Sequence, residues 1–395
     1  MILRVFIWIL LLIVLPDIYL DRHYLRHMLN PYCWWKRLLW WCPALFMIVY
    51  TTMLACTDNF LPSEQIWIIV YFYFWGILIV PKFAYVVCSF VGKRIRKFIP
   101  MKINWGSIVG YAIAFVVTLL FFYSLTIGPR KLKVRHLDLT FHDLPESFEG
   151  YKIVQFSDAH IGTFNEVMDY TLKRDMDSII AQNPDMVCFT GDLQNMEPTE
   201  IDKQKMQLSR LAALGIPVYS VLGNHDYSVY IKAPQTVKVK NEKLLQLQER
   251  DLGWTLLKNQ NRKIYSRDKS QYFVLAGEEN GGDGKNAHSP AKANLKKTLS
   301  GTKPNDFIVM LQHDPKAWEE DILPHSHVQL TLSGHTHGGQ IGVLGLRPTL
   351  FSYKQDYGLY EKDGRYLYVS GGLGGVIPIR FGITPEIVVI TLHRK

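Results

Sequence analysis

The sequence predicts an α/β fold preceded by a membrane-spanning region, and two observations lead to this prediction. Four long apolar stretches fill the first third of the 395 residues. In the remainder, short apolar runs first alternate with helix-like stretches and then follow one another in a strand-rich half. This order is typical of two packed sheets flanked by helices. We therefore divide the chain into a transmembrane region at 1–128 and an α/β domain at 129–395.

The four apolar stretches lie at about 2–20, 38–57, 66–88 and 106–127. A helix that crosses a bilayer needs about 20 mostly apolar residues, and each stretch meets or nearly meets this length. The first is the weakest, because Arg4 and the apolar run after it also fit a signal peptide. No small-residue cleavage site follows it, so we expect four retained transmembrane helices and a multi-pass protein of the cell membrane.

Charges beside the apolar stretches predict the orientation. Lysines and arginines lie between the first and second stretches and between the third and fourth, whereas only acids lie between the second and third. Loops rich in Lys and Arg stay in the cytoplasm, so both termini and the α/β domain are expected outside. Basic residues at 130–135 favour the opposite orientation. Lys82, behind Pro81, is interpreted as a lysine near a helix end that extends to the membrane interface.

The net charge of +9 also lies largely beside the apolar stretches. This placement favours membrane topology over nucleic-acid binding, and the sequence contains no arginine-rich tail. The expected partner is therefore the lipid bilayer and not a nucleic acid. The sequence predicts no oligomeric state.

The α/β domain is expected to begin with a half-exposed strand in "VRHLDLTF". Helical spacing of apolar residues predicts helices at 165–182 and 200–214 and a short helix near Leu295. The runs "GWTLLKN", "RKIYSR" and "YFVLAG" are expected in a second sheet, and "YLYVSGG" and "EIVVITL" are expected to pair and close a sheet.

Five further apolar runs end directly in polar motifs. The motifs are Asp158-Ala159-His160, Gly191-Asp192, Gly223-Asn224-His225-Asp226, His313 and Gly334-His335-Thr336-His337. Strand ends of this kind meet at one edge of a sheet, where α/β folds place their ligand sites. Carboxylate and amide oxygens together with imidazole nitrogens suit Mn, Fe and Zn. Each motif alone is weak evidence, and the prediction rests on all five in order.

The order of these motifs resembles the signature of the calcineurin-like metallophosphoesterases. The strings "SDAHIG", "GDL", "GNHD" and "SGHTHGGQI" are similar to the membrane-associated bacterial branch, as is the tail "LYVSGGLGGVIPIRFGITPEIVVITL". The resemblance covers about 130–395 and implies a four-layer α/β/β/α sandwich with two divalent metal ions.

The resemblance also implies a role for each motif residue. One ion would take Asp158, His160, Asp192 and His337, and the other Asp192, Asn224, His313 and His335, so that Asp192 bridges them. His225 would contact the substrate phosphate, and Asp226 would orient the His225 imidazole. A hydroxide held between the metals would attack phosphorus in line.

The hypothesis is a membrane-anchored phosphoesterase with two ions of Mn, Zn or Fe. Its substrate would be a phosphodiester, a pyrophosphate or a phosphomonoester, and anchoring beside the bilayer favours a lipid-linked envelope substrate. The alternative is a membrane receptor or scaffold with a structural metal site and no turnover, which would not need the His225-Asp226 pair. A transporter with a regulatory phosphatase-like domain would need buried polar residues in its helices.

Three further motifs are assigned no role in the chemistry. The glycine-rich 371–375 follows a strand without a clear helix after it, so we interpret it as a flexible loop at the rim of the site and not as a phosphate loop. Gly338-Gly339 is interpreted in the same way, and Glu278-Glu279 as solvated loop acids.

Overall fold

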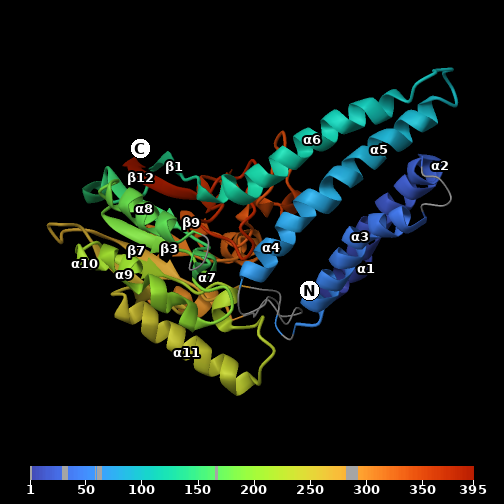
Figure 1. Cartoon of the computed structure of the whole chain (residues 1–395). Helices are drawn as coiled ribbons and strands as arrows, with labels where there is room; N and C mark the ends of the chain where they lie inside the picture. The colour runs from blue at the N-terminus through green and yellow to red at the C-terminus, as the bar shows by residue number, and fades with distance from the viewer. Residues whose placement is uncertain (1, 29–33, 58, 60–64, 165–167, 282–291) are drawn as a thin grey trace. The chain divides into compact units, whose positions relative to one another are not determined.

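The computed structural model describes residues 2–28, 34–57, 59, 65–164, 168–281 and 292–395 (Figure 1). Its internal contacts divide the chain into two compact units, Met1–Ile127 and Gly128–Lys395. We call them the helical unit and, because the five polar motifs with their expected chemistry lie in it, the catalytic unit, and describe each by itself.

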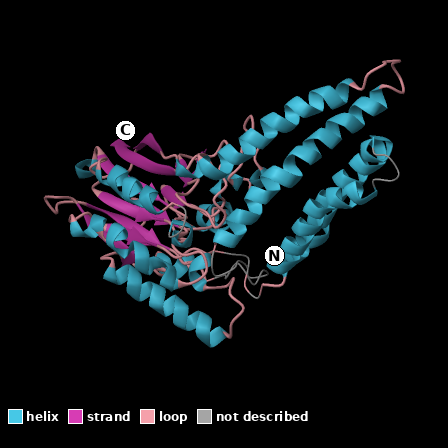
Figure 2. Ribbon diagram, viewed as in Figure 1, coloured by secondary structure: helices cyan, strands magenta, loops and turns pink. Residues whose placement is uncertain are grey.

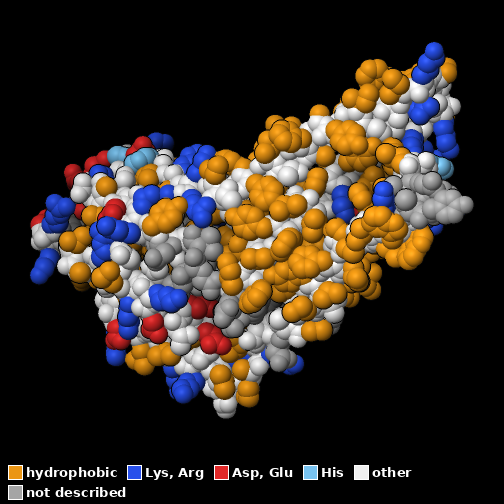
Figure 3. Space-filling model, in the orientation of Figure 1, with side chains coloured by type: hydrophobic (Ala, Val, Ile, Leu, Met, Phe, Trp, Pro, Cys, Tyr) orange, Lys and Arg blue, Asp and Glu red, His pale blue; other side chains and the backbone are white. Residues whose placement is uncertain are grey.

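The helical unit contains a helix for each of the four predicted apolar stretches. They are α1 (Ile2–Leu20), α3 (Trp34–Ala55), α4 (Ile66–Phe74) continued by α5 (Val80–Ile95), and α6 (Trp105–Thr126). Among the described residues, Trp34–Ala55, Ile66–Ile95 and Trp105–Arg130 are long and apolar enough to cross a membrane. Apolar side chains cover much of the visible face of these helices, as expected of a surface in contact with lipid (Figure 3).

The helix formed by α4 and α5 has one irregular turn. A π-helical segment, Trp75–Ile79, joins the two, and Pro81 follows at the start of α5. Proline has no amide hydrogen to donate and its ring crowds the preceding turn, which accounts for the local change of hydrogen bonding. Further on, α5 and α6 approach closely, because a Cβ on Gly92 would lie 2.6 Å from the Cα atom of Gly106.

The interpretation of Lys82 as a lysine that extends to the interface is wrong. Its Nζ atom donates to both carboxylate oxygens of Asp17, at 2.9 and 3.0 Å. Asp17 belongs to α1 and is fully buried. The Lys82 side chain is 16% exposed and lies over the Trp40 ring. The two charges therefore neutralise each other inside the helical unit.

The catalytic unit contains two six-stranded sheets (Figure 2). The first has the order β1 (Lys133–Phe141), β12 (Glu386–Arg394), β2 (Tyr151–Phe156), β3 (Met186–Phe189), β4 (Val218–Ser220) and β5 (Thr255–Leu256). The second has the order β10 (Gly358–Lys362), β11 (Arg365–Val369), β9 (Leu330–Ser333), β8 (Ile308–Leu311), β7 (Tyr272–Gly277) and β6 (Gln260–Tyr265). In the first, β2, β3 and β4 run parallel, as do β7, β8, β9 and β11 in the second.

Three apolar clusters stack the layers in the predicted α/β/β/α order. The cluster between the sheets joins Ile153 and Cys188 of the first sheet to Phe273 and Val309 of the second. The outer face of the first sheet packs against α8 (Asp169–Ile180) and α11 (Gln235–Asp251). The outer face of the second packs against a helical segment that contains Trp318. The four-layer sandwich is confirmed.

Two strand expectations are wrong. The residues Thr255–Leu256 join the first sheet beside β4 and not the second. The strands β11 and β12 do not pair, because β11 lies between β10 and β9 whereas β12 lies between β1 and β2. The apolar pattern identifies a strand, but the partner is chosen by tertiary packing.

The helix predictions hold with changed bounds. The first becomes α8, beginning at Asp169, and residues 165–167 lie outside the described part. The second is broken into a 3-10 helix (Pro198–Gln204) and the short helices α9 (Lys205–Leu208) and α10 (Arg210–Ala213). The short helix near Leu295 is α12 (Leu295–Thr298).

Candidate metal centre

The five polar motifs follow the carboxyl ends of five strands. Asp158 and His160 follow β2, Asp192 follows β3, and Asn224 follows β4. His313 follows β8, and His335 and His337 follow β9. Because β2, β3 and β4 are parallel neighbours, as are β8 and β9, these loops emerge at the same edge of each sheet. The fold brings all seven predicted ligand residues together.

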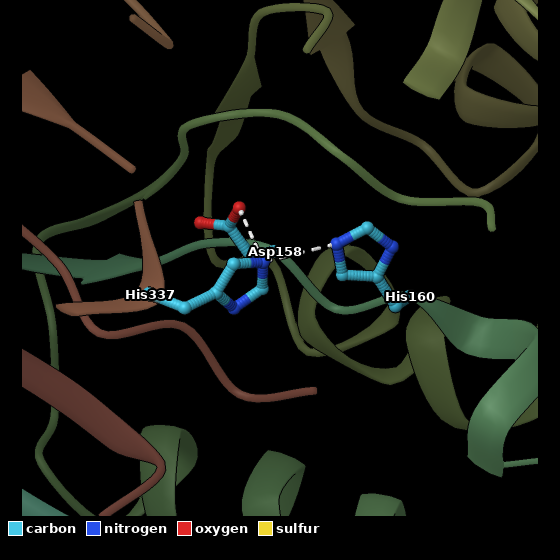
Figure 4. A group of neighbouring side chains, drawn as sticks. All are labelled: Asp158, His160 and His337. Carbon is cyan, nitrogen blue, oxygen red and sulfur yellow. Dashed lines mark hydrogen bonds and ion pairs between the residues drawn. The ribbon is translucent and has the colours of Figure 1, made fainter. Parts of the chain in front are cut away.

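One group of donor atoms contains Asp158, His160 and His337 (Figure 4). The Nε2 atom of His337 lies 3.4 Å from an Asp158 carboxylate oxygen and 3.3 Å from Nε2 of His160. Asp192 lies 3.7 Å from the same His160 nitrogen.

The second group contains Asp192, Asn224, His313 and His335. Nε2 of His313 lies 3.2 Å from Oδ2 of Asp192 and 3.2 Å from Oδ1 of Asn224. Nδ1 of His335 lies 2.8 Å from Oδ1 of Asn224 and 3.3 Å from Nε2 of His313. The Oδ2 atom of Asp192 faces both groups, which is the position that a bridging ligand requires.

The spacing of these atoms fits divalent metal ions. Ligands at about 2.0–2.2 Å from an ion lie roughly 3.0–3.5 Å from one another. The tautomers also fit, because Nδ1 of His313 lies 2.7 Å from the Thr190 carbonyl oxygen, which can only accept. In neutral His313 this leaves a lone pair on Nε2, directed at the oxygens of Asp192 and Asn224. A divalent ion bound here would take the place of the proton that Nε2 of His313 otherwise shares with Asp192.

Burial and mutual charge shift the pKa values of these groups. Burial raises the pKa of Asp158 to about 7 and lowers that of His160 to about 3. Burial also acts against ionisation of Asp192, but the imidazoles of His313, His225 and His160 hold its pKa well below the usual range. Burial likewise acts against the charged form of His313, yet Asp192 raises its pKa to about 10. The carboxylates therefore attract positive charge, whereas His160 stays neutral and keeps a lone pair that can bind an ion.

The backbone of the site is strained. Asp158, His160, Asp192, His335 and His337 all have positive φ angles, between 48° and 74°. Residues with a Cβ atom seldom adopt this conformation, and it concentrates at functional sites where the surrounding structure enforces it. Five of the seven predicted ligands share it, so the chain holds these side chains in an orientation that an ordinary turn would not give.

The structure places Asp226 differently from the expectation. Its carboxylate accepts hydrogen bonds from the backbone amides of Asp192, Leu193, Gln194 and Gly223, at 2.8–3.3 Å. It therefore fixes the turn that carries Asp192 and does not orient the imidazole of His225. Four amide donors stabilise the Asp226 carboxylate more strongly than a single imidazole could.

The His225 ring is held by other groups. Its Nδ1 donates to the Asn195 carbonyl oxygen at 2.7 Å, and the ring stacks on Tyr230 with centroids 4.2 Å apart. One of its ring nitrogens belongs to a cluster with ligand atoms of His160 and Asp192 that all lie within 4.8 Å of one another. Because Nδ1 is engaged, Nε2 is the nitrogen available at the metal centre.

Several supporting residues were missed by the sequence analysis. Tyr353 Oη lies 2.8 Å from Nε2 of His335, and Nη2 of Arg380 lies 3.3 Å from Nδ1 of His337. Arg380 is 2% exposed and donates to the carbonyl oxygens of Gly371 and Gly374. The only signal for Arg380 in the sequence is its place in the tail that resembles the bacterial branch.

The glycine-rich 371–375 is buried and packs under the site, so its interpretation as a flexible rim loop is wrong. A Cβ on Gly372 would lie 2.7 Å from Cβ of Asp158, and one on Gly374 would lie 1.9 Å from the Ala159 carbonyl oxygen. Glycine is needed here because the loop touches the ligand-bearing backbone.

Glu278 is also not a solvated loop acid. It is fully buried and accepts a hydrogen bond from Gln312 at 2.8 Å. Glu279 is partly buried and pairs with Lys258.

Comparison with known proteins gives matches to both units. Residues 151–339 match the family model of calcineurin-like phosphoesterases. Residues 3–129 match the model described as a probable calcineurin-like phosphoesterase transmembrane domain.

Three curated relatives illustrate the range of similarity. The uncharacterized metallophosphoesterase YkuE of Bacillus subtilis is 29% identical over 276 residues, which cover 68% of this chain and 88% of YkuE. A zebrafish transmembrane protein with a metallophosphoesterase domain is 26% identical, covering 73% of this chain and 64% of that protein. The UDP-2,3-diacylglucosamine pyrophosphatase LpxG of Chlamydia trachomatis is 26% identical, covering 66% and 88%.

Proposed function

We propose that this protein acts on a lipid-linked substrate. The chain carries a calcineurin-like phosphoesterase domain after its membrane helices and is therefore a membrane-bound, metal-dependent phosphoester hydrolase. The bond cleaved is a phosphodiester, a pyrophosphate or a phosphomonoester. In this proposal residues 1–128 form the transmembrane region and residues 129–395 the catalytic domain, which lies on the outer face of the cell membrane.

The observation that carries the proposal is the convergence of seven donor side chains at the strand ends. We assign Asp158, His160, Asp192 and His337 to one divalent ion, and Asp192, Asn224, His313 and His335 to the other. Two ions of Mn, Zn or Fe, when bound, supply Lewis acidity and an activated water. Carboxylates and imidazoles at these spacings suit such ions.

The chain's own residues then position the substrate. His225, fixed through an Nδ1–H donated to the Asn195 carbonyl oxygen, presents Nε2 to the phosphoryl group, and in its imidazolium form Nε2–H serves the leaving oxygen as a proton donor. Asp226 acts indirectly, since its four amide contacts hold the turn that carries Asp192. The carbonyl that fixes the His225 tautomer has the orienting role that was expected of Asp226.

Two facts support a lipid-linked substrate. The strand β1 begins at Lys133, only seven positions after α6 ends at Thr126, so the connecting chain spans about 25 Å at most. The catalytic unit must therefore stay close to the bilayer. In addition, the relative LpxG is named a pyrophosphatase of a diacylated sugar nucleotide.

Hydrolysis by purified wild type and Asp192→Asn tests the proposal. Both are assayed with Mn²⁺ on an aryl phosphodiester and an aryl phosphomonoester, and bound metal is counted. Asp138→Asn is the matched control, because the Asp138 side chain is 74% exposed on β1. We expect wild type and Asp138→Asn to turn over and Asp192→Asn to lose both activity and metal. Two bound ions without turnover of either ester or of a lipid pyrophosphate would instead favour a receptor or scaffold with a structural metal site.

A further inference from the structure

An apolar hairpin leaves the catalytic unit directly after the metal centre. We use this name for residues 341–351, which begin four positions after His337. Leu344 is 100% exposed, Phe351 94% and Leu346 72%. Exposed apolar groups of this density, rimmed by polar residues, mark an interaction surface.

The hairpin is ordered at its base, so its apolar side chains are held outward. Val343 and Leu346 exchange two backbone hydrogen bonds of 2.9–3.0 Å around the turn at Leu344 and Gly345. Arg347 forms a bidentate ion pair with Asp356, at 2.6 and 2.8 Å, and Asp356 is fully buried. Such a pair fixes the loop without covering Leu344 or Phe351.

The hairpin lies beside the point where the chain leaves the membrane helices. Gly128, two residues after α6 ends, is buried against Arg380, because a Cβ there would lie 1.9 Å from the Arg380 carbonyl oxygen. The next residue, Phe381, accepts from Gly342 at 2.7 Å and forms a bridge with Ile341. Paired strands are about 4.8 Å apart. The base of the hairpin is thus roughly two backbone spacings from the residue that follows the last membrane helix.

The segment that directly follows the hairpin contacts the metal centre. Tyr353, two residues past the hairpin, reaches Nε2 of His335 at 2.8 Å. Gln340, one residue before it, donates its amide to the carbonyl oxygen of Ile377 next to the buried glycine-rich loop. Basic side chains border the apolar tip, since Arg347 lies within it and Lys354, with a side chain 79% exposed, follows it.

We propose that the apolar hairpin inserts into the bilayer, with Leu344, Leu346 and Phe351 among the acyl chains and Lys354 at the phosphate level. Apolar side chains bordered by basic ones are typical of interfacial anchors. The occupant is the bilayer and not a protein partner, because the hairpin base adjoins the residue at which α6 delivers the chain. Insertion of the hairpin would place the metal centre beside lipid phosphates. The insertion itself does not require that the protein hydrolyse a substrate.

Quenching of a fluorescent label by lipid tests the proposal. Cys33, Cys42, Cys56 and Cys88 are replaced by serine, Cys188 is retained because it is buried, and Leu344→Cys is labelled with the environment-sensitive dye NBD. Met206→Cys, at a 73% exposed apolar position of the catalytic unit, is the matched control. Each protein is reconstituted into phosphatidylcholine–phosphatidylglycerol vesicles with and without acyl-chain nitroxide lipid.

We expect nitroxide lipid to quench the label at 344 at least threefold more strongly than the label at 206. Phe351→Cys is a second probe with the same expected result. Equal quenching at 344 and 206, or protection of 344 through a second copy in detergent, would overturn the proposal. Hydrolysis of an aryl phosphodiester by the labelled proteins is measured in parallel. If quenching occurs but this ester, an aryl phosphomonoester and a lipid pyrophosphate all remain intact, the proposed function fails and the insertion stands.

Discussion

The helical unit and the metal centre bury acidic side chains in opposite ways. In the helical unit each buried acid among the described residues has its own cation, since Asp17 pairs with Lys82 and Asp21 with Arg37. In the catalytic unit Asp158 and Asp192 converge, and no described lysine or arginine forms an ion pair with either. Their partners are imidazoles and backbone amides. The first arrangement is complete as it stands, whereas the second is complete only when cations are supplied.

This difference distinguishes a structural ion pair from a cluster that binds an ion or reacts. A buried ion pair satisfies itself and is weak evidence for activity, although removing one partner is costly. Uncompensated carboxylates are costly to bury, and a chain retains them where they hold a metal or react. The Asp17–Lys82 pair is therefore satisfied within the helical unit without a ligand.

The largest effect is expected at a residue that is not a metal ligand in this account. His225→Ala should lower kcat by about 10²–10⁴ because the proton donor is lost. The bound metal should remain at two ions per chain. Steady-state kinetics with metal analysis checks this, and His136→Ala, at an exposed position of β1, is the control. Loss of a bound ion in His225→Ala would show that His225 is a metal ligand and would contradict its assignment as a proton donor only.

The stability of the helical unit should fall when one partner of the Asp17–Lys82 ion pair is removed. Lys82→Met leaves Asp17 buried without a cation and should lower stability by about 3–5 kcal/mol. The double variant Lys82→Met/Asp17→Leu should recover most of the loss. Thermal unfolding in detergent measures both, beside Lys36→Met at an exposed position. Equal losses in the single and double variants would contradict a self-contained pair.

A smaller effect is expected at Arg380, which supports the metal centre without neutralising a carboxylate. Arg380→Met should weaken one metal by about 10–100-fold, because Arg380 fixes the 371–375 loop that packs against Asp158. Arg380→Lys should be intermediate, since it retains charge but not the fork that reaches Gly371 and Gly374. Metal titration separates the two ions, with the 95% exposed Arg267→Met as control. An unchanged metal affinity at both sites would show that Arg380 does not support metal binding.

The smallest effect is expected at Glu249, an acid that is buried in its protonated form and not beside a cation. Glu249 is fully buried beside Ser220, and burial raises its pKa to about 8. Since the unfolded value is near 4.3, folding takes up a proton between these pH values, and this group's contribution to stability falls as pH rises through them. Relative to wild type, Glu249→Gln should gain on the order of 1 kcal/mol for each pH unit between pH 5 and 7.

Melting temperatures of wild type and Glu249→Gln at pH 5, 6 and 7 measure this gain. Glu146→Gln is the control, because the Glu146 side chain is 85% exposed. A difference between Glu249→Gln and wild type that does not change with pH would show that Glu249 is ionised in the folded protein.

Local patterns in the sequence predicted most of the elements, and the family resemblance supplied the candidate ligand set. Apolar runs ending in polar motifs placed Asp158, Asp192 and His313 at strand ends, because strand periodicity and turn chemistry are local properties. The pairing of Asp17 with Lys82 was missed because helix packing joins residues 65 positions apart. Strand order decided the partner of β12 in the same way.

The supporting groups of the site were missed for the same reason. Asn195 acts through a backbone carbonyl, which any residue type supplies, so its identity carries no signal. The buried 371–375 loop resembled a flexible segment because glycine serves both flexible loops and close backbone contacts. Asp226 was misassigned because adjacency to His225 in sequence did not mean contact in space.

Counting divalent ions in variants of the two donor groups tests the central claim most directly. Metal-free protein is titrated with Mn²⁺, and bound metal is measured in wild type, His337→Ala and His335→Ala. We predict two ions in wild type and a loss of high-affinity binding at one site in each variant, because each histidine belongs to a different group. Binding of one ion or none by wild type, or of two ions with unchanged affinity by both variants, would contradict the account.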